Sequence, residues 1–135
     1  MEDWKYLIRV ISSKEHNMSR DQLIEQIKET GTDRYDSERK QIFDHFYGKH
    51  DVHFFADRTN EDSYENKLAE VVRNFPVKTM GDRKQAVVPD IAIIYDARKC
   101  EMVMNVYDDI ETSDCFQFKG DPKEALVEVR RLDVK

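Results

Sequence analysis

Residues 87–109, VVPDIAIIYDARKCEMVMNVYDD, carry the side chains of this sequence that are best suited to chemistry. Two apolar runs flank a short polar turn, and the pair Pro89-Asp90 opens the first run. A carboxylate in this position can bind a hard divalent cation through its oxygens. The alternative is structural, because proline is tolerated at the start of a strand and a neighbouring aspartate caps or turns the chain.

Together with the residues on either side, this stretch resembles the core of the PD-(D/E)xK, or restriction-endonuclease-like, superfamily over residues 62–119. That core has a helix with an acidic residue, followed by a hairpin with Pro-Asp on one strand and (D/E)xK on the next. The resemblance implies a phosphodiesterase that acts on nucleic acid with Mg²⁺ or Mn²⁺ as cofactor. It also allows a descendant that has lost catalysis.

The resemblance assigns the catalytic roles to Asp90 and Lys119. The metal ligands that it implies are Asp90, Glu65, Glu70, Asn105 and Gln117. The chain departs from the motif at residues 105–107, which read Asn-Val-Tyr where the family has an acid and a lysine. A second register, with Gln117 and Lys119 on the following strand, supplies a lysine but needs a longer connection.

Five acidic residues, which we call the acidic group, lie close together around the second apolar run. They are Glu101, Asp108, Asp109, Glu111 and Asp114. The group lacks the ligand spacing and the turn glycine of an EF-hand, so a calcium loop is not indicated. We expect it to contact a basic surface on a protein partner, since complementary charge speeds and selects association.

The composition bounds the class of protein. A chain of 135 residues fits one domain, residues 1–135, and 39% hydrophobic residues can build a core. The net charge of −6 opposes a sequence-independent coat for nucleic acid, which needs a basic excess. No apolar run approaches the roughly 20 residues that span a bilayer, and the N-terminal residues lack a signal-peptide pattern. With only Cys100 and Cys115, we expect free thiols and a cytoplasmic location.

Hydrophobic periodicity predicts the elements that must position these residues. Strands are expected at 4–11, 51–57, 87–95, 101–107 and 115–119. Helices are expected from Ser19, with a capping box to Gln22, to a stop at Gly31, and then over 37–47, 62–75 and 121–132. Pro76 is expected to end the third helix, and Asp121 with Pro122 to begin the last.

The order of these elements predicts an α+β fold in a single domain. We expect a central mixed sheet of about four to five strands with a C-terminal antiparallel meander, and helices on one or both faces. The favoured function is a small acidic cytoplasmic protein that binds another protein, as inhibitors, immunity proteins and adaptors do, without catalysis or a cofactor. The alternative is the metal-dependent nuclease-like domain, with nucleic acid as the partner.

Overall fold

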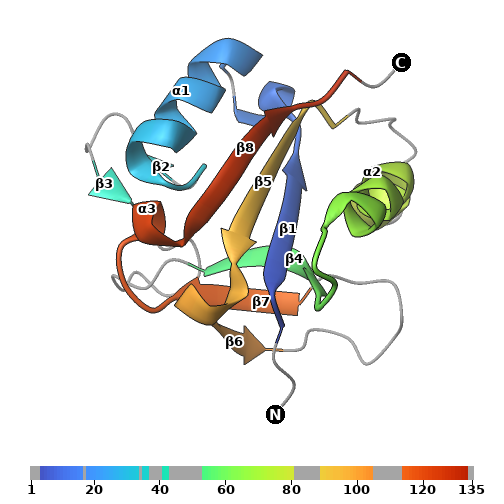
Figure 1. The fold of residues 1–135 in the computed structure, drawn as a ribbon. Coiled ribbons are helices and arrows are strands. Elements are labelled where there is room, and N and C mark those ends of the chain that lie inside the picture. Colours follow the sequence, from blue (N-terminus) through green and yellow to red (C-terminus); the bar gives the residue numbers. More distant parts are fainter. Residues whose placement is uncertain are drawn as a thin grey trace.

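The computed structural model describes residues 4–16, 18–33, 35–36, 41–42, 53–80, 89–104 and 114–133. Six strands form one sheet in the order β6-β7-β4-β1-β5-β8, and β2 pairs with β3 (Figure 1). The strands are β1 (Tyr6–Ile11), β2 (Tyr35–Asp36), β3 (Gln41–Ile42), β4 (His53–Thr59), β5 (Ile91–Asp96), β6 (Cys100–Met104), β7 (Asp114–Phe118) and β8 (Leu126–Arg131). The helices are η1 (Ser13–His16), α1 (Arg20–Thr30), α2 (Glu65–Met80), η2 (Ala97–Lys99) and α3 (Pro122–Ala125). The predicted α+β class is confirmed.

β1 and β5, which pair with each other in the sheet, place apolar residues on both faces, and each face is covered by a helix. In β1, Leu7 and Ile11 pack in the core beneath α1, whereas Ile8 and Val10 pack in the core beneath α2. Figure 1 shows α1 and α2 on opposite sides of these strands. Burying each of these side chains stabilises the fold by about 1.5–3 kcal/mol relative to exposure, so the alternation fixes the register of β1.

α1 begins and ends where the sequence predicts. The Ser19 hydroxyl oxygen accepts a hydrogen bond from the backbone N–H of Gln22. The Gln22 side-chain oxygen in turn accepts one from the backbone N–H of Ser19, which completes the capping box. Gly31 ends the helix in the left-handed conformation with φ of 87°. The helix is therefore bounded by local chemistry at both ends.

The sheet differs from the prediction in direction and in connectivity. Every pairing among the described strands is antiparallel, so the expected mixed sheet is wrong. Strands that are apolar on both faces are typical of parallel sheets, but two covering helices bury an antiparallel sheet equally well. The predicted meander is confirmed only for β6 and β7, because β5 pairs with β1 and β8 instead of β6. The Asp96 side chain accepts from the Arg98 amide at the start of η2, so a tight turn separates β5 from β6.

The predicted C-terminal helix is wrong beyond its first turn. Asp121 caps α3 and Pro122 begins it, as expected, but the helix ends at Ala125 and β8 follows. β8 contains Val127 and Val129, whose branched side chains favour a strand. By pairing with β5, β8 provides hydrogen-bond partners for backbone groups of β5 that would have none if residues 126–131 were helical.

Two other predicted helices also differ from the structure. α2 continues through Pro76 to Met80, although Pro76 has no N–H to donate to the carbonyl one turn earlier. The helix expected over 37–47 is wrong at Gln41–Ile42, which form β3. Its other residues lie outside the described part of the chain.

Replacing Gly31 by alanine should destabilise the protein by about 2–4 kcal/mol, since the residue would be strained and would also overpack. A Cβ at Gly31 would lie 2.3 Å from the Lys123 nitrogen and 2.4 Å from the Pro122 carbonyl carbon. Gly120 is the matched control, because the nearest atom to a Cβ there, on Glu124, is 4.0 Å away. Denaturant unfolding should show a much smaller loss for Gly120→Ala. Equal losses would contradict the close approach of α1 and α3.

Candidate functional site

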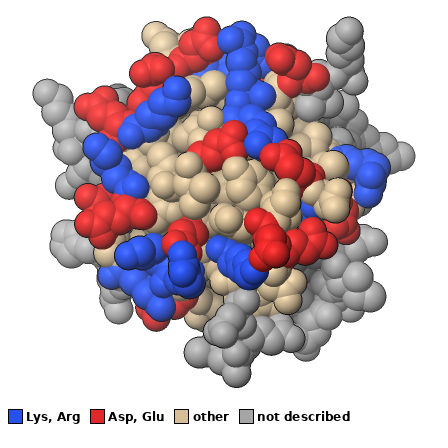
Figure 2. All heavy atoms as spheres, in the orientation of Figure 1, with Lys and Arg blue, Asp and Glu red and all other residues tan. Residues whose placement is uncertain are grey.

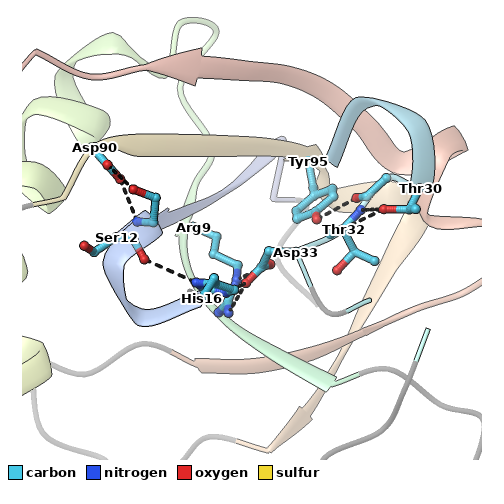
Figure 3. Close-up of polar contacts among 10 residues, drawn as sticks. Arg9, Ser12, His16, Thr30, Thr32, Asp33, Asp90 and Tyr95 are labelled. Carbon is cyan, nitrogen blue, oxygen red and sulfur yellow. Dashed lines mark hydrogen bonds and ion pairs between the residues drawn. The ribbon is translucent and has the colours of Figure 1, made fainter. Parts of the chain in front are cut away.

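Asp90 lies directly before β5 and is bonded on every polar side. Its carboxylate accepts from the Ser13 amide at 2.9 Å and from Ser13 Oγ at 2.5 Å. Its backbone N–H donates to the Ile11 carbonyl, and its carbonyl accepts from the Leu132 amide. Asp90 therefore joins the end of β1, the start of η1 and the residue after β8, which supports the structural interpretation of the Pro-Asp pair. Figure 3 shows the contacts of its carboxylate.

The structure does not bring Lys119 and Gln117 to Asp90. Gln117 is on β7, and Lys119 directly follows that strand. In the sheet, β4 and β1 separate β7 from β5. Three steps between strands span about 14 Å, whereas the ligands of one Mg²⁺ all lie about 2 Å from the ion.

The other residues implied as metal ligands have partners elsewhere or are not described. Glu65 binds the Arg130 guanidinium through two bonds, at 2.6 and 2.7 Å, and Glu70 pairs with Lys67 at 3.3 Å. The Gln117 side chain donates to Glu101. Asn105 lies outside the described residues. Within the described part of the chain, no group of three or more histidine, cysteine and acidic side chains has the arrangement of a metal site.

A polar cluster that the sequence analysis did not predict lies beneath the loop after α1. Arg9 lies on β1 between Leu7 and Ile11, on the face covered by α1. Its guanidinium donates to both Asp33 oxygens at 2.9 Å, through Nε and through an outer nitrogen. The Asp33 side chain is 1% exposed and that of Arg9 is 14% exposed, so this ion pair is buried.

His16 completes the cluster with hydrogen bonds from both ring nitrogens (Figure 3). Nε2 lies 3.1 Å from Asp33, and Nδ1 lies 3.2 Å from the Ser12 carbonyl. Both neighbours are acceptors, so both nitrogens must carry a proton for the two bonds to form. The hydrogen bond to Asp33 raises the pKa of His16 despite partial burial. Burial works against the Asp33 carboxylate, but the Arg9 charge and the two donors outweigh it and hold its pKa below the ordinary value.

The arrangement resembles a catalytic dyad in composition but not in geometry. A general base needs an imidazole nitrogen that is free to take a proton from a substrate or a nucleophile. Here both His16 nitrogens are engaged, and the nearby Ser13 hydroxyl is bonded to Asp90. The cluster is therefore suited to holding β1, η1 and the loop after α1 together.

The same loop is held by neutral hydrogen bonds on its inner side. The buried Tyr95 hydroxyl donates to the Gly31 carbonyl at 2.8 Å. Thr30 Oγ1 lies 2.8 Å from the carbonyls of Gln26 and Thr32. Burial raises the pKa of Tyr95, which keeps this donor protonated.

Only part of the acidic group is described. Glu101 is an exposed residue of β6, and Asp114 begins β7. Asp108, Asp109 and Glu111 belong to residues 105–113, which connect the two strands and lie outside the described part. β6 and β7 pair antiparallel, with Glu101 opposite Gln117, and all five residues fall in the sequence between the start of β6 and the start of β7.

Sequence reasoning missed Arg9, His16 and Asp33 as a group, although one signal was present. The alternation of β1 places Arg9 on the same face as Leu7 and Ile11. An arginine at a core-facing position needs a buried acidic partner. The pattern could not identify that partner, because Asp33 follows a helix and approaches only in the folded chain.

Comparisons of the chain with protein-family models, curated proteins and solved structures found no match. The hairpin implied by the nuclease resemblance is also not formed, since the strand that follows Pro89-Asp90 does not pair with β6. Among the described helices, none has the length and apolar character needed to cross a bilayer.

Replacing His16 by glutamine should make the free energy of unfolding fall less between pH 6 and pH 9 than it does in the wild-type protein. The pKa of His16 is raised above its ordinary 6.5 in the folded protein, so its contribution is complete below about pH 6.5 and is lost as the pH rises through the folded-state pKa. His16→Gln should cost about 1.5–3 kcal/mol near pH 6, the range for hydrogen bonds to charged groups, and less near pH 9. Denaturant unfolding at a series of pH values measures the difference.

The exposed Lys14, in the same turn, is the control, since Lys14→Gln should follow the wild-type pH profile. A cost of His16→Gln that stays constant over this pH range would contradict a charged imidazolium.

Proposed function

We propose that the protein acts by binding another protein that presents a basic surface, and that the contact is made by the β6–β7 hairpin. The observation that carries this proposal is the position of β6 at one end of the sheet. An edge strand exposes backbone groups and side chains that can pair with another chain. The acidic group lies on this same hairpin.

An exposed apolar residue on β6 supports a contact surface at this edge. Met102 is 40% exposed and lies next to Glu101, which is also exposed. Methionine adapts its shape to irregular partner surfaces, and such residues recur at binding patches. An edge strand that exposes an acidic side chain on one face and an apolar one on the other suits a partner that combines basic residues with a shallow apolar site.

Charge supports a basic partner in particular. The chain carries 28 acidic and 22 basic residues, and Asp108, Asp109, Glu111 and Asp114 fall within one short stretch. Complementary charge of this kind mainly raises the association rate, and its effect falls with added salt. The partner is therefore expected to associate fastest at low ionic strength.

The alternative of a metal-dependent phosphodiesterase has less support. It requires the Asp90 carboxylate, which Ser13 occupies, and the Glu65 carboxylate, which Arg130 occupies. Binding through the hairpin needs neither group. A cytoplasmic location belongs to this proposal, and the free, buried thiol of Cys100 is consistent with it.

Removing charge from the hairpin should slow partner association. The test variant combines Asp108→Asn, Asp109→Asn, Glu111→Gln and Asp114→Asn. A photo-crosslinking residue at position 102 first identifies the partner, which is then purified. At low salt the variant should associate at least about tenfold more slowly than wild type, with a weaker salt dependence.

The matched control removes four exposed acidic residues elsewhere: Glu25→Gln, Glu29→Gln, Glu61→Gln and Asp62→Asn. It has the same net charge as the test variant, so only the position of the charge differs. Equal on-rates for the two variants would contradict the proposed surface. Crosslinking at position 102 that yields no specific protein would contradict it as well.

A further inference from the structure

β8 lies at the opposite end of the sheet. The backbone hydrogen bonds show which of its residues direct their N–H and C=O groups toward β5 and which direct them away from the sheet. Ala97 N donates to the Lys5 carbonyl, and Leu132 N donates to the Asp90 carbonyl. Residues in an antiparallel strand turn their backbone groups alternately to the two sides. The first bond therefore turns the odd-numbered residues of β5 toward β1. The second turns the carbonyl of Asp90, which directly precedes β5, toward β8, and the even-numbered residues of β5 follow it; the Asp90 N–H itself donates to the Ile11 carbonyl.

It follows that Glu128 and Arg130 direct their backbone groups to β5, because they lie opposite Ile94 and Ala92. Val129 and Arg131 direct theirs away from the sheet. Val127 lies at a bulge, between the pairs Ile94–Glu128 and Tyr95–Leu126, and the residue is 46% exposed. In Figure 1 no described helix or strand crosses in front of β8.

The side chains of β8 carry opposite charges on the face toward α2. Arg130 Nε lies 2.9 Å from Glu128, Arg130 also binds Glu65, and the Tyr64 hydroxyl donates to Glu128. On the other face, Val129 packs against the core beneath α1, and Arg131 lies 3.5 Å from Asp21. Figure 2 shows an uncharged centre on this side of the molecule, with acidic and basic residues around it.

This pattern is complementary to itself in one antiparallel register. In a symmetric pair of β8 strands, the outward groups meet only if odd residues lie opposite odd residues. A twofold axis at residue 128 would oppose Glu128 to itself, and an axis at residue 130 would oppose Arg130 to itself. An axis at Val129 places Glu128 of each copy opposite Arg130 of the other. It also aligns the whole stretch from Val127 to Arg131.

We propose that β8 is a self-association surface that pairs with β8 of a second copy of this chain, antiparallel and with the twofold axis at Val129. Val129 of each copy exchanges backbone hydrogen bonds with Val129 of the other, and Val127 lies opposite Arg131. The sheet then continues from one copy into the next. Since β6 lies at the far end of each sheet, the dimer presents one β6–β7 hairpin at each outer end. Two such hairpins would strengthen binding to a multivalent partner.

The first test is sedimentation velocity over a concentration series. Wild type should shift from monomer to dimer as its concentration rises, and Val129→Pro should remain monomeric. Proline at this position removes no hydrogen bond to β5, so the pairing of β8 with β5 should persist, although the packing of the Val129 side chain against the core is also lost. Val129→Thr keeps the N–H and is the matched control, which should dimerise. A monomer at all concentrations, or a dimer unaffected by Val129→Pro, would overturn the proposal.

The second test is specific to the register and does not depend on the proline variant. In a Cys100→Ala/Cys115→Ala background with wild-type circular dichroism, Val129→Cys should form an intermolecular disulfide under mild oxidation. Directly opposed residues lie about 5.5 Å apart between Cα atoms, within the range of a disulfide. Val127→Cys alone should not crosslink, but a mixture of Val127→Cys and Arg131→Cys chains should. Crosslinking by Val127→Cys alone would overturn the register.

Discussion

The buried ion pair between Arg9 and Asp33 is the constraint on which the rest of the structure depends. Arg9 lies on the central strand β1 among apolar core residues, and its charge must be neutralised there. Asp33 meets that need only if the loop after α1 turns inward, which Gly31 allows. His16 then bonds to the same carboxylate and fixes η1, and η1 supplies Ser13 to Asp90. One buried charge thus links β1, α1, η1 and β5.

Because the buried polar residues bind one another, the surfaces that we propose for binding lie elsewhere, at the two ends of the sheet. The described groups that look chemically active, namely His16, Asp33, Asp90 and Ser13, are engaged with one another or with the backbone. Among the described strands, β6 and β8 each pair with one neighbour, whereas the strands between them pair with two. β6 carries exposed Met102 beside acidic residues, and β8 carries exposed Val127 beside alternating charges. Both patterns suit recognition by another chain.

Local chemistry could be predicted from the sequence, whereas long-range pairing could not. The capping box at Ser19 and the stop at Gly31 depend on neighbouring residues, and both were predicted. The helix expected over 121–132 failed because the spacing of Ala125, Leu126 and Val129 fits a helix, while the edge of β5 favours a strand. Likewise, the Pro-Asp pair could be located but not interpreted, because Ser13 lies 77 residues away along the chain. The alternation of β1 could have shown Arg9 as a core-facing charge, but it could not have shown its partner.

The central claim, that the charge of Arg9 must be neutralised by Asp33, is tested most directly by a double-mutant cycle measured through the free energy of unfolding. Asp33→Leu alone leaves the Arg9 guanidinium buried and unpaired, and should cost about 3–5 kcal/mol. Adding Arg9→Met removes that charge and should recover most of the loss. If the double variant were instead as unstable as the sum of the two single variants, Arg9 and Asp33 would act independently and the account would be wrong.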